Sequence, residues 1–268
     1  MNFNLLVGST LSKARERILA SAYFPLTRYY PYGVSWLYDL MRIKGTRALD
    51  TVFDVGANRG QTVEALLKFA PDAAIHSFEP GSKVFEELQQ AYGDRRNVRL
   101  HRMALGSKTE QRSMQIRDDS LLNTLVSSTA GAAGASTETI EISTVDEIAA
   151  LNGISHLDLL KMDVQGWEME VIRGASSLIA NQNVMFVFAE VTFSANESEM
   201  QQFGEFHDCM TRNDFTLCGF YEPMRYGPRK EFILFSNALY VSPAARLKWT
   251  DIGPEWDRWM ATQKPPAS

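Results

Sequence analysis

Strand and helix patterns alternate from residue 51 to residue 242, and this alternation limits the fold of the 268-residue chain more than any other feature. Runs rich in β-branched and aromatic residues are each followed by a turn and then by an apolar-periodic segment. The expected strands are 51–55, 73–79, 97–105, 156–164 and 184–191, the expected helices are 61–70, 82–92, 167–180 and 197–213, and two last strands are expected at 215–221 and 232–242. This alternation predicts parallel βαβ units in an open α/β sheet with helices on both faces.

Two polar-alternating segments, 108–117 and 137–143, interrupt the alternation and could form the strands of a hairpin. The residues between them, 118–136, are rich in Ser, Ala, Gly and Thr. An insertion of this length inside a compact domain is usually functional or mobile. We expect it to act as a lid that binds the acceptor molecule, and a surface loop without that role is the alternative. The polar residues expected to bind a polyhydroxylated acceptor are Ser120, Asn123 and Thr124.

Composition narrows the possible partners and the compartment. The chain is 45% hydrophobic and 22% charged, and its net charge of −5 predicts no nucleic acid partner because it offers no basic field. The two cysteines, Cys209 and Cys218, are not clustered, which favours a reducing, cytoplasmic compartment without structural zinc. No segment reaches the ~18 apolar residues of a membrane-spanning helix. Residues 11–20 are basic and amphipathic and could contact a membrane surface peripherally, although a helix packed on the domain is the alternative.

The expected organisation is one domain with an extension at each end. Residues 1–50 are expected to form a helical extension packed on the core, and residues 51–242 are expected to form the alternating domain. Residues 243–268 contain three tryptophans and are expected to pack on the core as a tail. No sequence feature indicates an oligomeric state.

A glycine turn follows the first expected strand in the segment FDVGANRGQT. Asp54 ends the strand, and Gly56 and Gly60 bracket a short turn in which backbone can approach a ligand closely. A dinucleotide site would need the spacing G-x-G-x-x-G, which this turn lacks, so a nicotinamide oxidoreductase is disfavoured. An acid before the first glycine suits the ammonium group of S-adenosylmethionine instead. An ordinary strand–helix turn is the alternative.

A second acid, Glu79, ends the second expected strand in the segment HSFEPGS. A carboxylate at this place in an open α/β sheet can accept hydrogen bonds from both ribose hydroxyls of an adenosine. The alternative is an exposed cap or ion pair. Together, Glu79 and Asp54 predict a site for a ligand that contains adenosine.

The segment LLKMDVQGWEME places Lys161 and Asp163 two residues apart, and thus on the same face of a strand. Burying an ammonium and a carboxylate there is costly unless they are paired, hydrogen-bonded or used in chemistry. Lys161 could orient Asp163 or Glu168, stabilise an alkoxide or bind an acidic substrate. A structural ion pair between Lys161 and Asp163 is the alternative. Glu168 is expected in the first turn of the following helix, where the helix dipole favours it.

Glu190, at the end of the fifth expected strand, lies at the same edge as Asp163. Either carboxylate could act as a general base and remove the proton of a hydroxyl group. Together they could instead bind Mg²⁺, which would lower the pKa of a coordinated hydroxyl. The expected catalytic residues are therefore Asp163, Lys161 and Glu190.

The motifs FDVGANRGQT, FEP, MALGS, DLLKMDVQGWEMEVIRGA and NALYV resemble those of the FkbM-type methyltransferases in order and spacing, over roughly residues 50–242. The resemblance implies a doubly wound, Rossmann-like methyltransferase sheet of seven strands, mostly parallel, with an antiparallel last strand and an N-terminal helical extension. It also implies S-adenosylmethionine as cofactor. One departure is Gln165, where many members carry Glu.

The resemblance further implies roles for individual residues. The residues implied to hold the methionine part are Asp54, Gly56, Asn58 and Gly60; Glu79 would hold the ribose, Ala104 and Leu105 would flank the adenine, and Asp163 would lie beside the methyl group. The implied activity is O-methyl transfer to a hydroxyl of a sugar, glycan or glycosylated natural product. The alternatives are metal-assisted O-methylation of a small molecule and a non-catalytic module that binds S-adenosylmethionine.

Overall fold

The computed structural model describes residues 32–44, 49–116, 136–197 and 199–247. The chain divides into two compact units, Met1–Val34 and Ser35–Ser268, and every element described below belongs to the second. The helices are α2 (Trp36–Lys44), α3 (Gln61–Phe69), α4 (Ser82–Tyr92), α5 (Val145–Leu151), α6 (Glu168–Gly174), α7 (Ser176–Ala180), α8 (Phe203–Arg212) and α9 (Pro243–Leu247). The strands are β1 (Thr51–Val55), β2 (Ala74–Phe78), β3 (Val98–His101), β4 (Ala104–Leu105), β5 (Glu110–Ile116), β6 (Ser136–Ser143), β7 (Leu157–Met162), β8 (Val184–Thr192), β9 (Thr216–Tyr226) and β10 (Phe232–Val241).

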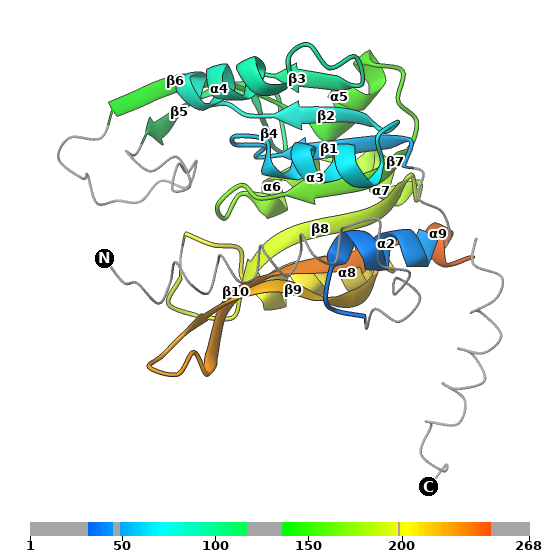
Figure 1. Cartoon of the computed structure of the whole chain (residues 1–268), viewed down its shortest axis with the longest axis vertical. Coiled ribbons are helices and arrows are strands. Elements are labelled where there is room, and N and C mark those ends of the chain that lie inside the picture. The colour runs from blue at the N-terminus through cyan, green and yellow to red at the C-terminus, as the bar shows by residue number, and fades with distance from the viewer. Residues whose placement is uncertain (1–31, 45–48, 117–135, 198, 248–268) are drawn as a thin grey trace, which may run out of the picture. The chain divides into compact units, whose positions relative to one another are not determined.

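A seven-stranded sheet with the order β3-β2-β1-β7-β8-β10-β9 forms the centre of the second unit (Figure 1). Its strands pair in parallel except for β10, which runs antiparallel to both β8 and β9. This arrangement confirms the predicted doubly wound sheet with an antiparallel last strand. A smaller sheet, with the order β4-β6-β5, contains the β5–β6 hairpin suggested by the polar-alternating segments.

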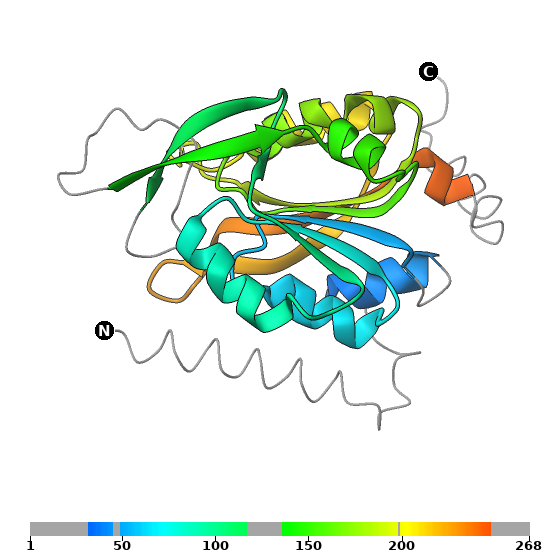
Figure 2. The ribbon, with the colours of Figure 1, turned by 90° about the horizontal axis from the view of Figure 1, so that it is seen from above.

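Helices cover both faces of the central sheet (Figure 2). Successive strand residues point to opposite faces, so Leu159 packs with residues of α2 and α3 while Leu160 packs with residues of α5, α6 and α8. The strands are therefore apolar almost throughout, as is usual when a parallel sheet is buried on both faces. Polar residues of these strands therefore stand out, and several of them lie at the carboxyl ends of the strands, including Asp54 and Lys161.

Helix α2 packs on the sheet through Trp36, whose ring stacks on Phe188 at a centroid distance of 4.4 Å. Asp39 is fully buried beside them and accepts a hydrogen bond of 2.8 Å from the hydroxyl of Tyr221 in β9. This contact joins segments at opposite ends of the sequence. The amphipathic segment 11–20 and the three-tryptophan tail beyond residue 247 lie outside the described residues.

The third expected strand, 97–105, is two strands in the structure. β3 ends at His101, and after Arg102 and Met103 the chain enters β4, which pairs with β6 in the smaller sheet. A continuous strand was expected because the apolar pattern runs through the break. Helix α5 was not expected, although Thr144 caps it by accepting a hydrogen bond of 3.0 Å from the backbone N–H of Glu147. No helix among the described residues is long and apolar enough to cross a membrane.

Candidate functional site

The carboxyl ends of β1, β2, β7 and β8 lie at one edge of the central sheet (Figure 1). The register pairs Asp54 of β1 with Lys161 of β7, and Met162 of β7 with Ala189 of β8. This places Asp54, Lys161, Asp163 and Glu190 on neighbouring strand ends, as the sequence patterns predict. These four polar side chains therefore lie together at the carboxyl ends of otherwise apolar strands.

Lys161 is buried at the centre of this edge. Its ammonium lies 3.0 Å from Oδ1 of Asp54 and 3.8 Å from Oδ2 of Asp163, and it donates a hydrogen bond of 3.2 Å to the carbonyl oxygen of Gly56. Burial alone would lower the pKa of Lys161, but the carboxylates of Asp54 and Asp163 outweigh that effect and raise it. Lys161 is therefore a buried cation that links β1, the glycine turn and the end of β7.

Asp54 is fully buried, with an exposed fraction of 0%. Burial raises the pKa of its carboxyl group, and the neighbouring ammonium of Lys161 opposes this rise. Among the described residues, Oδ2 of Asp54 has no hydrogen-bond partner. A buried carboxylate oxygen without a partner is costly, so this atom marks a place where a ligand could donate a hydrogen bond.

The glycine turn is shaped by backbone packing. Gly56 has φ +75°, and a Cβ atom there would lie 2.0 Å from the carbonyl oxygen of Asp163. The N–H groups of Gly56 and Ala57 both donate to the carbonyl oxygen of Phe78, at 3.0 and 2.9 Å. At Gly60, with φ +87°, a Cβ atom would lie 2.3 Å from the ring of Tyr92. The turn is thus held against β7, β2 and α4, and its shape requires glycine at both positions.

Glu79 joins the two turns that follow β1 and β2. Its Oε2 accepts a hydrogen bond of 3.0 Å from the N–H of Asn58, and its Oε1 accepts one of 2.9 Å from the N–H of Gly81. Burial raises the pKa of Glu79, although these hydrogen bonds oppose the rise. Each carboxylate oxygen has a second lone pair. Glu79 can therefore hold the turns and still accept hydrogen bonds from a ligand.

The two residues implied to flank an adenine, Ala104 and Leu105, are both buried. Leu105 has an exposed fraction of 0% and packs in the main core, while Ala104 belongs to the small core of the second sheet, against which Trp167 packs. Only their backbone could therefore contact an adenine. That role stays a prediction.

Asp163 begins the turn between β7 and α6, and several contacts fix its position. Its N–H donates to the carbonyl oxygen of Val55 at 3.1 Å, and its Oδ1 accepts a hydrogen bond of 3.3 Å from the side chain of Gln165. At Gly166, with φ +86°, a Cβ atom would lie 2.6 Å from the carbonyl oxygen of Glu199. The side chain of Asp163 is 43% exposed, so it is open to a substrate.

Glu168 also lies at this edge, and its burial is not predicted by the sequence patterns. It lies in the first turn of α6, as expected, but its exposed fraction is 1%. Its Oε1 accepts a hydrogen bond of 3.1 Å from the N–H of Val164, and its Oε2 has no partner among the described residues. Burial, and to a lesser extent Asp163, raise the pKa of Glu168 to about 7. The only sequence signal was a further acid five residues after Asp163 and seven after Lys161.

Glu190, near the end of β8, is influenced by the same group of acids. Burial raises its pKa to about 8, with further contributions from the negative charges of Asp163 and Glu168, while Lys161 opposes the rise. No group of three or more His, Cys, Asp or Glu residues within the described ranges could hold a metal ion. The ammonium of Lys161 also occupies the space beside Asp163. The Mg²⁺ hypothesis therefore has no support here, and no step is assigned to a metal.

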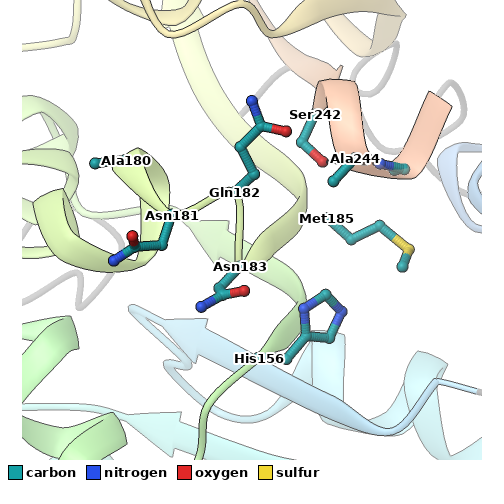
Figure 3. A pocket seen from close by; sticks show the side chains of 9 residues that line it. His156, Ala180, Asn181, Gln182, Asn183, Met185, Ser242 and Ala244 are labelled. Atoms are coloured by element: carbon teal, nitrogen blue, oxygen red, sulfur yellow. Dashed lines mark hydrogen bonds between the residues drawn. The ribbon is translucent and has the colours of Figure 1, made fainter. Parts of the chain in front are cut away.

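The predicted acceptor-binding residues Ser120, Asn123 and Thr124 lie outside the described residues. A pocket of about 440 Å³ is present at the opposite edge of the sheet, lined by residues that include His156, Asn183 and Ser242 (Figure 3). These residues precede β7 and β8 or follow the antiparallel β10. The pocket is thus at the amino ends of the parallel strands, away from the acids.

Similar folds occur in solved methyltransferase structures of low sequence identity. A putative RNA methyltransferase of Pyrococcus horikoshii is 11% identical with a TM-score of 0.42, over 77% of this chain and 82% of its own. Aeropyrum pernix fibrillarin, solved with bound S-adenosyl-L-methionine, is 13% identical with a TM-score of 0.42, over 75% and 73%. An rRNA methylase of Streptococcus thermophilus is 9% identical with a TM-score of 0.43, over 77% and 96%.

The prediction that excludes nucleic acid as a partner is contradicted by these neighbours, several of which are RNA methyltransferases, and we withdraw it. The physical reason is that a net charge of −5 is a sum over the whole chain. It does not report local basic clusters, such as the exposed Arg225, Arg229 and Lys230 near the turn between β9 and β10.

No curated protein is significantly similar to this chain in sequence. The Methyltransferase FkbM domain family matches residues 54–217, which begin at Asp54 and extend into β9. The match includes the glycine turn, Glu79 and the segment from Lys161 to Glu190. Because the match spans more than half of the 268 residues, the chain belongs to the FkbM methyltransferase family.

Proposed function

We propose that this protein transfers a methyl group from S-adenosylmethionine to a hydroxyl group, most suitably a hydroxyl of a sugar or glycan. The observation that carries the proposal is the buried carboxylate of Asp54, whose Oδ2 has no partner among the described residues at the carboxyl edge of the sheet. An ammonium group of the donor would satisfy that oxygen. Membership of the FkbM family supports methyl transfer, and the sugar acceptor rests on the family resemblance.

The proposed division of labour follows the contacts at the edge. Asp54 and the turn from Gly56 to Gly60 would hold the methionine part of the donor, and Glu79 the ribose. Lys161 fixes Asp54 and Asp163 relative to each other. Bound S-adenosylmethionine would supply an electrophilic methyl group. Asp163 would orient the acceptor beside it, since a hydroxyl held in line gains most of its rate advantage from alignment.

Glu190 is the proposed general base. Asp163 already pairs with the ammonium of Lys161 at 3.8 Å, which leaves Glu190 as the carboxylate available to act as the base. Burial and the neighbouring acids raise the pKa of Glu190 to about 8, so its ionised form is a strong proton acceptor near neutral pH. Glu190 would remove the hydroxyl proton as the O–C bond forms.

Binding of S-adenosylhomocysteine, measured by calorimetry, tests the cofactor assignment. We expect binding by the wild-type protein and a dissociation constant about 10- to 100-fold larger for Asp54→Asn, because a hydrogen bond to a charged group is lost. Glu64→Gln, at the exposed Glu64, is the matched control and should bind like wild type. Mass detection of methylated products from panels of glycans, small polyols and RNA oligonucleotides then identifies the acceptor. A protein that binds the ligand and methylates nothing would be a non-catalytic module, and one that binds nothing would overturn the cofactor assignment.

The pH dependence of the rate tests the proposed base. At subsaturating donor, kcat/KM should rise about tenfold per pH unit from pH 6 and level off with a midpoint near 8, because Glu190 must lose its proton before it can act. Glu190→Gln should lower the rate by about 10²- to 10⁴-fold and remove this dependence. The exposed Glu205→Gln on α8 should change neither quantity. A profile that stays flat between pH 6 and 9 would exclude Glu190 as the base.

A further inference from the structure

Among the described residues, more acids than cations surround Glu190, which lies next to the strand end that carries Asp163 because Met162 pairs with Ala189. The charges that act on Glu190 are those of Asp163, Glu168 and Glu222, which disfavour its ionised form, and that of Lys161, which favours it. Lys161 is already engaged by Asp54 at 3.0 Å. Within the described ranges, Lys161 is thus shared by Asp54 and Asp163, and little positive charge is left to offset Glu168 and Glu190.

Glu168 is a buried acid of this group whose hydrogen bonding is incomplete among the described residues. It is 1% exposed, and one carboxylate oxygen accepts a hydrogen bond from the N–H of Val164 at 3.1 Å while the other has no partner among the described residues. An ionised carboxylate in this position is costly, and a proton on the group removes that cost. The negative charge of Glu168 in turn disfavours ionisation of Glu190.

We propose that Glu190, which is influenced by the charge of the buried Glu168, retains a proton until a positively charged methyl donor binds, so that the base forms only in the donor complex. This inference rests on the proposed function. A positive charge within ~4–6 Å of a carboxyl group lowers its pKa by about 1 to 3. Asp163 is the residue that the family resemblance places beside the methyl group. The sulfonium charge of the donor would therefore lie close to these acids. Glu190 would then ionise and could accept the hydroxyl proton.

The transfer step returns the proton to the same group. Glu190 takes the hydroxyl proton while the acceptor O–C bond forms and the donor C–S bond breaks, with its electron pair remaining on sulfur. The positive charge of the donor disappears in this step. Glu190 then regains its high proton affinity and does not return the proton to the ether product. Glu168 is a positioning residue in this scheme, because it acts through the charge on Glu190 and through the turn at Val164.

Calorimetry in buffers of different ionisation enthalpy measures the protons released on binding. At pH 7.5 we expect S-adenosylmethionine to release between about one half and one proton more than S-adenosylhomocysteine, because only the former carries the sulfonium charge. The affinity for S-adenosylmethionine should rise severalfold, approaching tenfold, per pH unit between pH 6.5 and 7.5, while the affinity for S-adenosylhomocysteine should change much less. This comparison uses the wild-type protein and needs no folded variant.

Variants of the acids identify which residue releases the proton when the donor binds. Glu190→Gln should abolish the difference between the two ligands, and Glu168→Gln should reduce it by lowering the proton affinity of Glu190. The exposed Glu205→Gln should leave it unchanged. Equal proton release for both ligands, or a full difference in Glu190→Gln, would overturn the inference while leaving the cofactor assignment intact. Failure of the wild-type protein to bind either ligand would overturn both.

Discussion

Replacing Lys161 with methionine is expected to lower the free energy of unfolding by about 3–5 kcal/mol at pH 8, the usual cost of breaking a buried ion pair by removing one partner. Methionine preserves most of the volume but leaves the carboxylate of Asp54 buried without its cation at 3.0 Å. The loss should be smaller at pH 5, because burial raises the pKa of Asp54 and a protonated carboxyl group needs no counter-charge. Urea unfolding at the two pH values measures the effect.

Two further variants identify the cause of that loss. Lys108→Met removes an exposed lysine that pairs with Glu110 at 2.9 Å, and it should cost at most about 1 kcal/mol. Asp54→Asn combined with Lys161→Met removes both charges and should recover part of the stability lost in Lys161→Met. If Lys161→Met were as stable as Lys108→Met at both pH values, the buried ion pair would not be important for the fold.

Gly56→Ala is expected to destabilise the protein by about 2–5 kcal/mol and to prevent ligand binding. The backbone φ of +75° costs a residue with a Cβ atom about 1–2 kcal/mol. The new methyl group would also lie 2.0 Å from the carbonyl oxygen of Asp163, and overpacking of this kind typically costs a further 1–3 kcal/mol. The carbonyl group cannot yield cheaply, because the N–H of Asp163 is bound to Val55 at 3.1 Å.

Gly153→Ala is the matched control for Gly56→Ala. Gly153 also has a positive φ, +66°, but a Cβ atom there would have no atom within 4 Å. The Gly153→Ala variant should therefore lose only the free energy that the backbone conformation costs a residue with a Cβ atom. Thermal unfolding and S-adenosylhomocysteine calorimetry on both variants measure the difference. Equal destabilisation of the two would mean that the turn can move away from β7, and that Asp163 does not fix it.

The strands and the acids at their ends were predictable because both signals are local. Apolar runs such as 184–191 can only be strands or short buried helices, and a polar residue such as Asp54 at the end of such a run stands out. The alternation of the runs then brings the ends of neighbouring strands together at one edge. This is why Asp54, Lys161, Asp163 and Glu190 were found from sequence.

The burial of Glu168 was not predictable in the same way. A glutamate in the first turn of a helix is usually solvated and favoured by the helix dipole. In the structure Glu168 is instead 1% exposed, and its Oε1 accepts a hydrogen bond from the N–H of Val164 in the turn before α6. The need for glycine at position 56 was likewise ascribed to a ligand, whereas the group that approaches it in the structure is the carbonyl of Asp163. Contacts between residues more than 100 positions apart leave no local pattern.

The position of β10 has a consequence for synthesis on the ribosome. Among the described strands β10 is the last to be made, yet it lies between β8 and β9. Until residues 232–241 leave the exit tunnel, the edge of β8 stays unpaired, and eight of its nine residues are buried in the finished sheet. Such an open apolar edge is a site for wrong pairing with other chains. The sheet therefore cannot be completed as β9 emerges, and folding of this half must wait until residue 241 is free of the ribosome.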